Sequence, residues 1–228
     1  MALFVLLVVF VVCGPASVAA VEEAVPEKAL CSVCALKGGE TEEEKVKAHS
    51  THGGTAYYFC SEGCKKEFDS DPAGYMPPVL PRPAPDVVFE TLQGEDARLS
   101  DFAGKTVLLD FWATWCKPCV KMMPQLQALQ DAYADKGLVV AGVSIDEGED
   151  RVKKIEKFLK KVKVGYPVFS DAKQNPAWNQ FRVKAIPALF LVDADGQVVA
   201  QWTGAIEHDA VKDAIEGRLG EVAAAKAD

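Results

Sequence analysis

The sequence has no block of positive charge and very little histidine. Its 228 residues include 25 Lys and Arg against 33 Asp and Glu, three His, and a formal net charge of -8. Binding to a nucleic-acid backbone needs a basic surface, so we expect no nucleic-acid partner. Seven cysteines are too few for a disulfide-dense scaffold, and the composition excludes collagen, coiled coil and extended disorder. We therefore expect one or two globular domains in which the cysteines are the feature to explain.

Residues 1–20 contain no charged side chain, and residues 3–12 form an unbroken apolar run. A run of this length suits the central part of a secretory signal better than a membrane span. Small residues up to Ala20 offer a cleavage position, whereas Cys13 follows the bulky Val12 and does not fit a lipoprotein cysteine. A signal peptide predicts an exported protein, periplasmic or in the cell envelope, with its other six cysteines in an oxidising compartment. Without cleavage, the same segment would anchor the protein to the membrane.

Proline divides the rest of the chain into two parts. Residues 77–85 hold five of the thirteen prolines, which predicts a semi-rigid extended linker. We expect a small cysteine-rich domain at 21–76, a larger domain at 86–220 and a tail at 221–228. No internal repeat relates the two parts.

The larger part alternates between strand and helix patterns, which predicts an α/β sandwich with a mixed sheet. One helix is expected to bury a single face, because its apolar residues recur at helical spacing: Met122, Leu126, Leu129 and Tyr133. Asn175 and Pro176 are expected to cap and open a short helix. The other expected elements are strands at 107–112, 138–145, 188–192 and 197–202, and helices at 151–161 and 207–219.

A cysteine pair separated by two residues, Cys116 and Cys119, stands where a buried strand turns into this helix. Unpaired amides and the helix dipole favour a thiolate at the first sulfur, to which Lys117 adds positive charge. Pro118 removes an amide that the first helical turn does not need, and Cys119 would resolve a mixed disulfide. A structural disulfide and half of a zinc site are the alternatives, and the context favours redox chemistry.

The segment Asp110 to Cys119, which includes Trp115, resembles the active-site strand and turn of thioredoxins. The wider stretch 84–219 is similar to the TlpA-type branch, the exported thiol-disulfide oxidoreductases. Further matches are the helix-kinking Pro124, the cis-proline pair Ile186 and Pro187, and the late glycine Gly204. The resemblance implies a thioredoxin-like three-layer sandwich, a redox-active Cys116–Cys119 disulfide without an organic cofactor, and protein disulfide or thiol substrates. Ile186 and Pro187 would position the partner chain, and a reducing direction would require a membrane electron donor.

Asp110 is a carboxylate inside a strand that we expect to be buried. The thioredoxin resemblance implies that it moves the proton of the second cysteine, since burial raises its pKa for that task. The lysine that partners this aspartate in thioredoxins aligns here with Gly142. Satisfaction by local hydrogen bonds alone is the alternative reading of Asp110.

Four cysteines precede the linker, as one CxxC pair and one CxxxC pair: Cys31, Cys34, Cys60 and Cys64. Two such pairs can place four sulfurs about one metal ion, and His49 and His52 are alternative ligands. Two structural disulfides would also suit a small exported domain. A module with so few large apolar side chains needs either a metal or disulfides to fold. The segment 57–75 resembles the YHS or TRASH family of small metal-binding modules, which implies that the four thiolates bind a heavy-metal ion, copper especially. Thiolate ligands favour zinc or Cu(I).

Together these features predict an exported thiol-disulfide oxidoreductase that reduces protein disulfides and carries a heavy-metal-binding module. The alternative is a metal (copper) chaperone or resistance protein whose redox domain maintains the thiols of the metal site.

Overall fold

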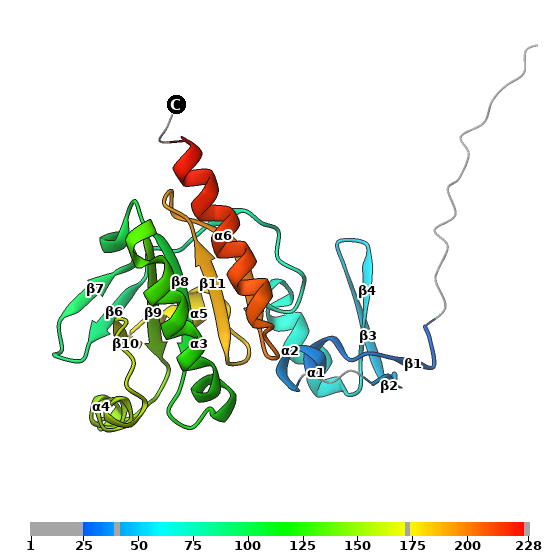
Figure 1. Ribbon diagram of the computed structural model, residues 1–228. Helices are drawn as coiled ribbons and strands as arrows, with labels where there is room; N and C mark the ends of the chain where they lie inside the picture. The colour runs from blue at the N-terminus through cyan, green and yellow to red at the C-terminus, as the bar shows by residue number, and fades with distance from the viewer. Residues whose placement is uncertain (1–24, 39–41, 172–173, 226–228) are drawn as a thin grey trace, which may run out of the picture.

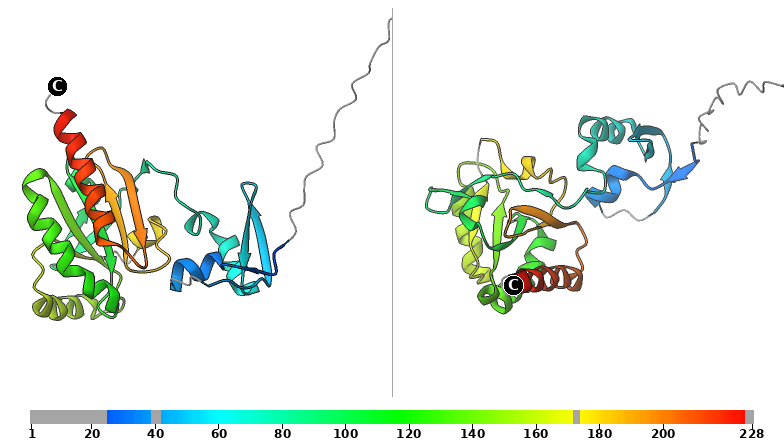
Figure 2. Two further views of the ribbon diagram at one scale, coloured as in Figure 1. Left: turned by 45° about the vertical axis from the view of Figure 1, so that its right-hand side comes forward. Right: turned by 90° about the horizontal axis from the view of Figure 1, so that it is seen from above.

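The computed structural model describes residues 25–38, 42–171 and 174–225. The expected signal peptide at 1–20 lies outside these residues. In the part of the chain that is described, no helix combines the length and apolar character needed to cross a membrane. The described residues form a small N-terminal module and a larger domain (Figures 1 and 2).

The larger domain is built on one eight-stranded mixed sheet (Figure 1). Its strands are β5 (Arg82–Pro83), β6 (Val88–Thr91), β7 (Asp96–Arg98), β8 (Thr106–Trp112), β9 (Leu138–Ser144), β10 (Val168–Asp171), β11 (Ala188–Val192) and β12 (Gln197–Thr203). They lie in the order β5-β12-β11-β8-β9-β10-β6-β7. The three central strands β8, β9 and β10 are parallel, and the remaining pairs are antiparallel.

Helices cover both faces of the sheet and complete the three layers. One face carries α3 (Lys117–Tyr133), α4 (Arg151–Val162) and α6 (His208–Ala225), and Figure 1 shows α3 and α6 in front of the strands. The other face carries α5 (Ala177–Gln180) and the 3-10 helix η2 (Leu99–Phe102). The expected thioredoxin-like sandwich is therefore confirmed.

Strand β8 shows why the sequence folds into layers. Side chains alternate across a strand, so Leu109 and Phe111 join the core under α5, whereas Leu108 and Trp112 face α3. The predicted apolar face of α3 is confirmed by its buried side chains, which include Met122, Leu126, Leu129 and Tyr133. The 3.6-residue spacing of apolar side chains therefore predicted correctly which face of the helix is buried.

Two helix boundaries differ from the prediction. Helix α5 is capped by Asp171, whose carboxylate accepts hydrogen bonds from the amides of Ala177 and Trp178 at 2.7 and 3.0 Å. Asn175 does not cap it, because the helix begins only after Pro176. Helix α6 continues to Ala225, so most of the expected tail at 221–228 belongs to a helix.

The N-terminal module has two two-stranded sheets, β1 (Lys28–Ala29) with β2 (Glu44–Lys45) and β3 (Ala48–His52) with β4 (Thr55–Phe59). Helices α1 (Ser32–Gly38) and α2 (Glu62–Ser70) and the 3-10 helix η1 (Pro72–Gly74) accompany them. Phe59, Phe68 and Tyr75 form its small buried core together with Val33. The Phe68 ring lies 5.2 Å from that of Phe59 and 6.3 Å from that of Tyr75.

The proline-rich segment does more than separate the two parts. Arg82 and Pro83 pair with Val198 and Gln197 as the edge strand β5, so two residues of the expected linker belong to the sheet. The module lies at the end of the sheet where β11 begins and β12 ends, as both figures show.

Candidate functional site

The Cys116–Cys119 pair forms a disulfide at the first turn of α3, with Cα atoms 5.3 Å apart. Cys116 is the N-cap residue, and its Sγ accepts a hydrogen bond from the Cys119 amide at 3.3 Å. Cys119 is fully buried and Cys116 is 5% exposed, whereas the neighbouring Trp115 is 66% exposed. When the bond is reduced, this amide and the positive end of the helix dipole stabilise a thiolate at Cys116.

The cis-proline segment meets this pair as predicted. The Ile186–Pro187 peptide bond is cis, and Ile186 packs against the buried cluster that contains Cys116 and Cys119. The Pro187 carbonyl accepts a hydrogen bond from Gly204 at 2.9 Å. Three segments that are distant in the sequence are therefore joined around the two sulfurs.

Asp146 holds the loop before the cysteines and was missed in the sequence. Its carboxylate accepts hydrogen bonds from the Thr114 amide and hydroxyl at 2.8 and 2.7 Å, and from the Ser144 hydroxyl at 2.7 Å. A signal was present, because Asp146 follows directly after an expected buried strand beside β8. In parallel sheets, such positions at the carboxyl ends of strands meet at one edge.

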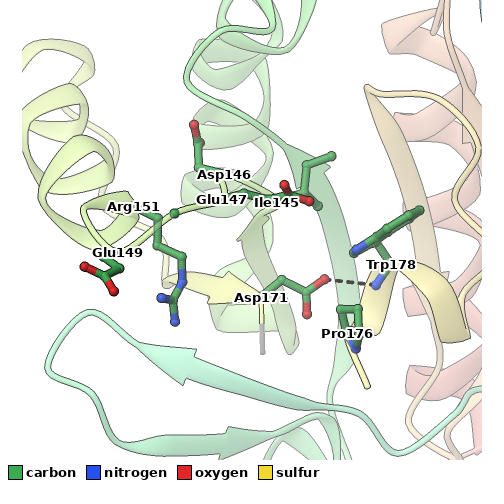
Figure 3. A pocket seen from close by; sticks show the side chains of 9 residues that line it. Ile145, Asp146, Glu147, Glu149, Arg151, Asp171, Pro176 and Trp178 are labelled. Carbon is green, nitrogen blue, oxygen red and sulfur yellow. Dashed lines mark hydrogen bonds between the residues drawn. The ribbon is translucent and has the colours of Figure 1, made fainter. Parts of the chain in front are cut away.

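A hollow of about 380 Å³ opens beside this loop (Figure 3). Its lining is acidic on one side, through Asp146, Glu147 and Glu149, and Trp178 closes the other side. Arg151 also lines the hollow, and its guanidinium is fixed in place by the hydrogen bonds that it donates to Glu90 and Ser170. Neither cysteine lines the hollow, so it lies beside the redox site and not within it.

Asp110 is fully buried on the α3 face of the sheet, opposite Gly142 of β9. Neither of its carboxylate oxygens has a hydrogen-bond partner among the described residues. Burial raises the pKa of Asp110 to about 7. The alternative that local hydrogen bonds satisfy this side chain therefore finds no support.

The four N-terminal cysteines come together in one cluster, with all four Sγ atoms within 4.8 Å of one another. The Cys34 Sγ lies 3.6 Å from that of Cys60 and 3.8 Å from that of Cys64, and the last two are 3.8 Å apart. A tetrahedron with metal–sulfur bonds of about 2.3 Å has edges of about 3.8 Å. The spacing thus fits four thiolates around one ion, and none of the four is in a disulfide. His49 and His52 lie exposed on β3 and outside the cluster.

The thiols of this cluster differ in pKa. Burial would raise the pKa of Cys31, but hydrogen bonds from backbone amides, including those of Cys34 and Cys60, outweigh it and lower the pKa to about 7. Burial raises the pKa of Cys60 to about 11, against the opposing effect of a hydrogen bond with Cys34, and hydrogen bonds with Cys31 and Cys64 raise it further. A bound cation would remove this conflict, because it favours the thiolate form of all four ligands.

The module contacts the cis-proline segment through charges that sequence reasoning did not connect. Asp71 forms ion pairs with Lys184 at 2.9 Å and with Arg182 at 3.6 Å. The Lys184 ammonium also lies 5.3 Å from the ring centroid of Tyr75. Gly74 permits this approach, because a Cβ atom there would overlap the Lys184 side chain.

Two family models match the chain in succession. Residues 80–201 match the AhpC/TSA family and residues 38–79 match the YHS domain. The YHS match includes Cys60 and Cys64 but begins after Cys31 and Cys34.

Similar proteins share the larger domain. The thiol-disulfide oxidoreductase ResA of Geobacillus thermodenitrificans is 35% identical over 133 residues, which are 58% of this chain and 74% of that protein. A solved thiol:disulfide interchange protein, DsbE, of Chlorobium tepidum is 33% identical with a TM-score of 0.56, over 61% of this chain and 96% of its own. The thioredoxin domain of a thiol-disulfide oxidoreductase from Bacteroides vulgatus is 28% identical with a TM-score of 0.53, over 60% and 98% of the two chains.

Proposed function

This chain belongs to the AhpC/TSA family as a thioredoxin-like thiol-disulfide oxidoreductase, and we propose that it is exported and reduces protein disulfides. The observation that carries the proposal is the Cys116–Cys119 disulfide at the start of α3, beside the Ile186–Pro187 bond. The apolar run at 3–12 supports export, for which the destination is the periplasm or cell envelope.

The proposed reaction starts from the reduced pair. The Cys116 thiolate attacks a substrate disulfide and forms a mixed disulfide, releasing one substrate thiolate. The Cys119 thiol passes its proton to the Asp110 carboxylate, and the resulting thiolate attacks the Cys116 Sγ. The second substrate sulfur leaves, and the two electrons of the dithiol have passed to the substrate. Ile186 and Pro187 align the substrate backbone during both steps.

Turnover in this direction requires a new supply of two electrons. We propose a membrane electron donor as the partner that reduces the Cys116–Cys119 disulfide after each cycle. The raised pKa of Asp110 supports its role in the proton step with Cys119, because a carboxyl that titrates near pH 7 can both accept and return the proton.

The test compares two cysteine variants in insulin reduction with dithiothreitol. Cys116→Ser should abolish catalysis, because no nucleophile remains. Cys119→Ser should also lose turnover but trap a covalent complex with the substrate, because attack occurs and resolution does not. Full activity of Cys116→Ser would refute the assignment, and a trapped complex in Cys116→Ser would reverse the roles of the two sulfurs.

We also propose that Cys31, Cys34, Cys60 and Cys64 hold one zinc or Cu(I) ion, as the near-tetrahedral sulfur spacing supports. When bound, the ion supplies a cross-link that folds the small module. Metal analysis of the full chain, combined with a thiol count before and after reduction, distinguishes the ion from two disulfides.

A second function is favoured by the contact between the two parts. Asp71 and Tyr75 of the module contact Lys184, two residues before Ile186, so the module that carries the cysteine cluster packs against the start of the substrate-positioning segment. This arrangement supports a metal chaperone or resistance protein whose Cys116–Cys119 dithiol reduces an oxidised cysteine pair of the metal site. In that exchange the module gains two thiols as Cys116 and Cys119 form their disulfide.

Copper titration and thiol counting test this second function on the full chain. After mild oxidation of the module, added dithiothreitol should restore Cu(I) binding much faster in the native protein than in Cys116→Ser. Equal rates of recovery would leave thiol-disulfide reduction of other proteins as the function.

A further inference from the structure

Three buried side chains around Gly142 carry polar atoms without a hydrogen-bond partner among the described residues. They are the Asp110 carboxylate oxygens, the Trp112 Nε1 and the Tyr166 hydroxyl. Asp110 and Trp112 are fully buried and Tyr166 is 4% exposed. Buried polar groups are nearly always hydrogen-bonded, so three unpaired groups in one region require an explanation.

Glycine at position 142 brings the three groups together. Gly142 lies opposite Asp110 in the parallel pairing of β8 and β9. A Cβ atom at Gly142 would lie 3.2 Å from the Trp112 Nε1 and 3.3 Å from the Tyr166 Cε2. The indole and the phenol ring therefore occupy the space beside Asp110 that a side chain on β9 would fill.

Electrostatics couples the phenol to the carboxylate. Burial, and then the negative charge of Asp110, raise the pKa of Tyr166 above its ordinary value. Tyr166 therefore keeps its proton while Asp110 titrates near pH 7, so its hydroxyl stays able to donate a hydrogen bond.

The other groups facing Asp110 carry no charge. Its neighbours in register are Gly142 on β9 and Leu189 on β11. The buried side chains of α3 are apolar apart from Cys119 and Tyr133, whose hydroxyl donates to Glu216. Besides Tyr166, the groups in this region that titrate are the Cys116 and Cys119 thiols, once their disulfide is reduced.

We propose that Tyr166 is a positioning residue for the Asp110 proton step, which it serves by donating a hydrogen bond to a water molecule that bridges it to the carboxylate. The Trp112 Nε1 donates the second hydrogen bond to this water, and the water donates to Asp110. Buried waters typically make about three such bonds, which is the number of groups present here.

The inference rests on the proposed role of Asp110 and assigns how its charge is tolerated. The proton passes from the Cys119 thiol to the Asp110 carboxylate, and Tyr166 neither gains nor loses one. Hydrogen bonds to the charged form of an acid lower its pKa. The bridge therefore increases the ionised fraction of Asp110 near neutral pH above the fraction that burial alone would allow.

The test variant is Tyr166→Phe, which removes one oxygen atom, with Tyr133→Phe as the matched control. Tyr133 is a buried phenol of α3 that donates to Glu216, away from the sulfurs. Tyr166→Phe should raise the pKa of Asp110 by about one, seen by carboxyl carbon NMR. Mixed-disulfide resolution at pH 7 should slow by about fivefold, because the ionised fraction of Asp110 falls from about one half to about one tenth. Raising the pH should restore the rate, and KM should not change. Tyr133→Phe should alter none of these.

A measurement on the native protein keeps the inference testable if Tyr166→Phe does not fold. The Trp112 indole proton and the Tyr166 ring carbon bonded to oxygen should shift in NMR with the same apparent pKa as the Asp110 carboxyl. Resonances of Trp112 and Tyr166 that ignore this titration would overturn the inference.

Asp110→Asn separates the two levels of the argument. If Asp110→Asn resolves slowly while Tyr166→Phe resolves at the native rate and pH profile, the role of Tyr166 is wrong and that of Asp110 stands. If Asp110→Asn resolves as fast as the native protein, the proposed proton step fails, and the inference about Tyr166 fails with it.

Discussion

Replacing Asp110 with Asn should make the larger domain more stable at pH 8. Asp110 is fully buried without a hydrogen-bond partner among the described residues, and burial raises its pKa from 3.8 to about 7. A buried charge costs free energy unless it is paired. The amide has the same shape and never carries that charge, so the variant avoids the cost of ionising the acid.

The sign and size follow from linkage. The folded state binds the Asp110 proton more tightly than the unfolded state does. The contribution of this proton to the free energy of unfolding is therefore fully present below pH 3.8 and is lost as the pH rises through 7. At about 1.4 kcal/mol per pKa unit, the difference amounts to roughly 4 kcal/mol at pH 8. We expect Asp110→Asn to gain about 2–4 kcal/mol over the native protein at pH 8, and little at pH 4.

Urea unfolding of the oxidised protein, followed by tryptophan fluorescence, measures this difference. All four tryptophans lie in the larger domain, so the signal does not depend on the metal module. Asp96→Asn, on the exposed strand β7, is the control and should leave the pH dependence unchanged. Parallel stability curves for the native protein and Asp110→Asn between pH 4 and pH 8 would refute the reasoning.

Three further predictions concern contacts that the structure adds. Asp146→Ala removes the hydrogen bonds to Thr114 and Ser144, so insulin reduction should fall by about tenfold while urea unfolding shifts only by roughly 1–2 kcal/mol; an unchanged rate would contradict a role in holding the loop. Lys184→Ala should speed proteolytic cleavage within residues 77–81 by releasing the module, although the partly exposed Asp71–Lys184 pair contributes only about 0.5–1 kcal/mol; a double-mutant cycle with Asp71→Ala that gives no coupling would show the pair to be incidental. Phe68→Ala removes the centre of the module core and should abolish metal binding by the full chain, yet leave the tryptophan-monitored transition in place; retained metal would mean that the ion alone folds the module.

The sequence by itself determined the features that depend on neighbours along the chain. The period of Met122, Leu126, Leu129 and Tyr133 is a property of one helix, and the position of Cys116 at its start follows from the strand before it. The spacing of the four N-terminal cysteines likewise predicted a single cluster, because each pair is held by a local turn. Local geometry of this kind is set by steric limits on a few adjacent residues.

Only the tertiary structure decided which distant residues meet. The Tyr166 ring lies beside the position opposite Asp110 because β9 has glycine there. Asp146 accepts from Thr114 because β8 and β9 are adjacent and parallel, and Asp71 pairs with Lys184 because the module lies beside β11. None of these pairs has a period or a spacing in the sequence. Their partners are chosen by sheet order and by packing across the whole domain, which bring together side chains from segments far apart in the chain.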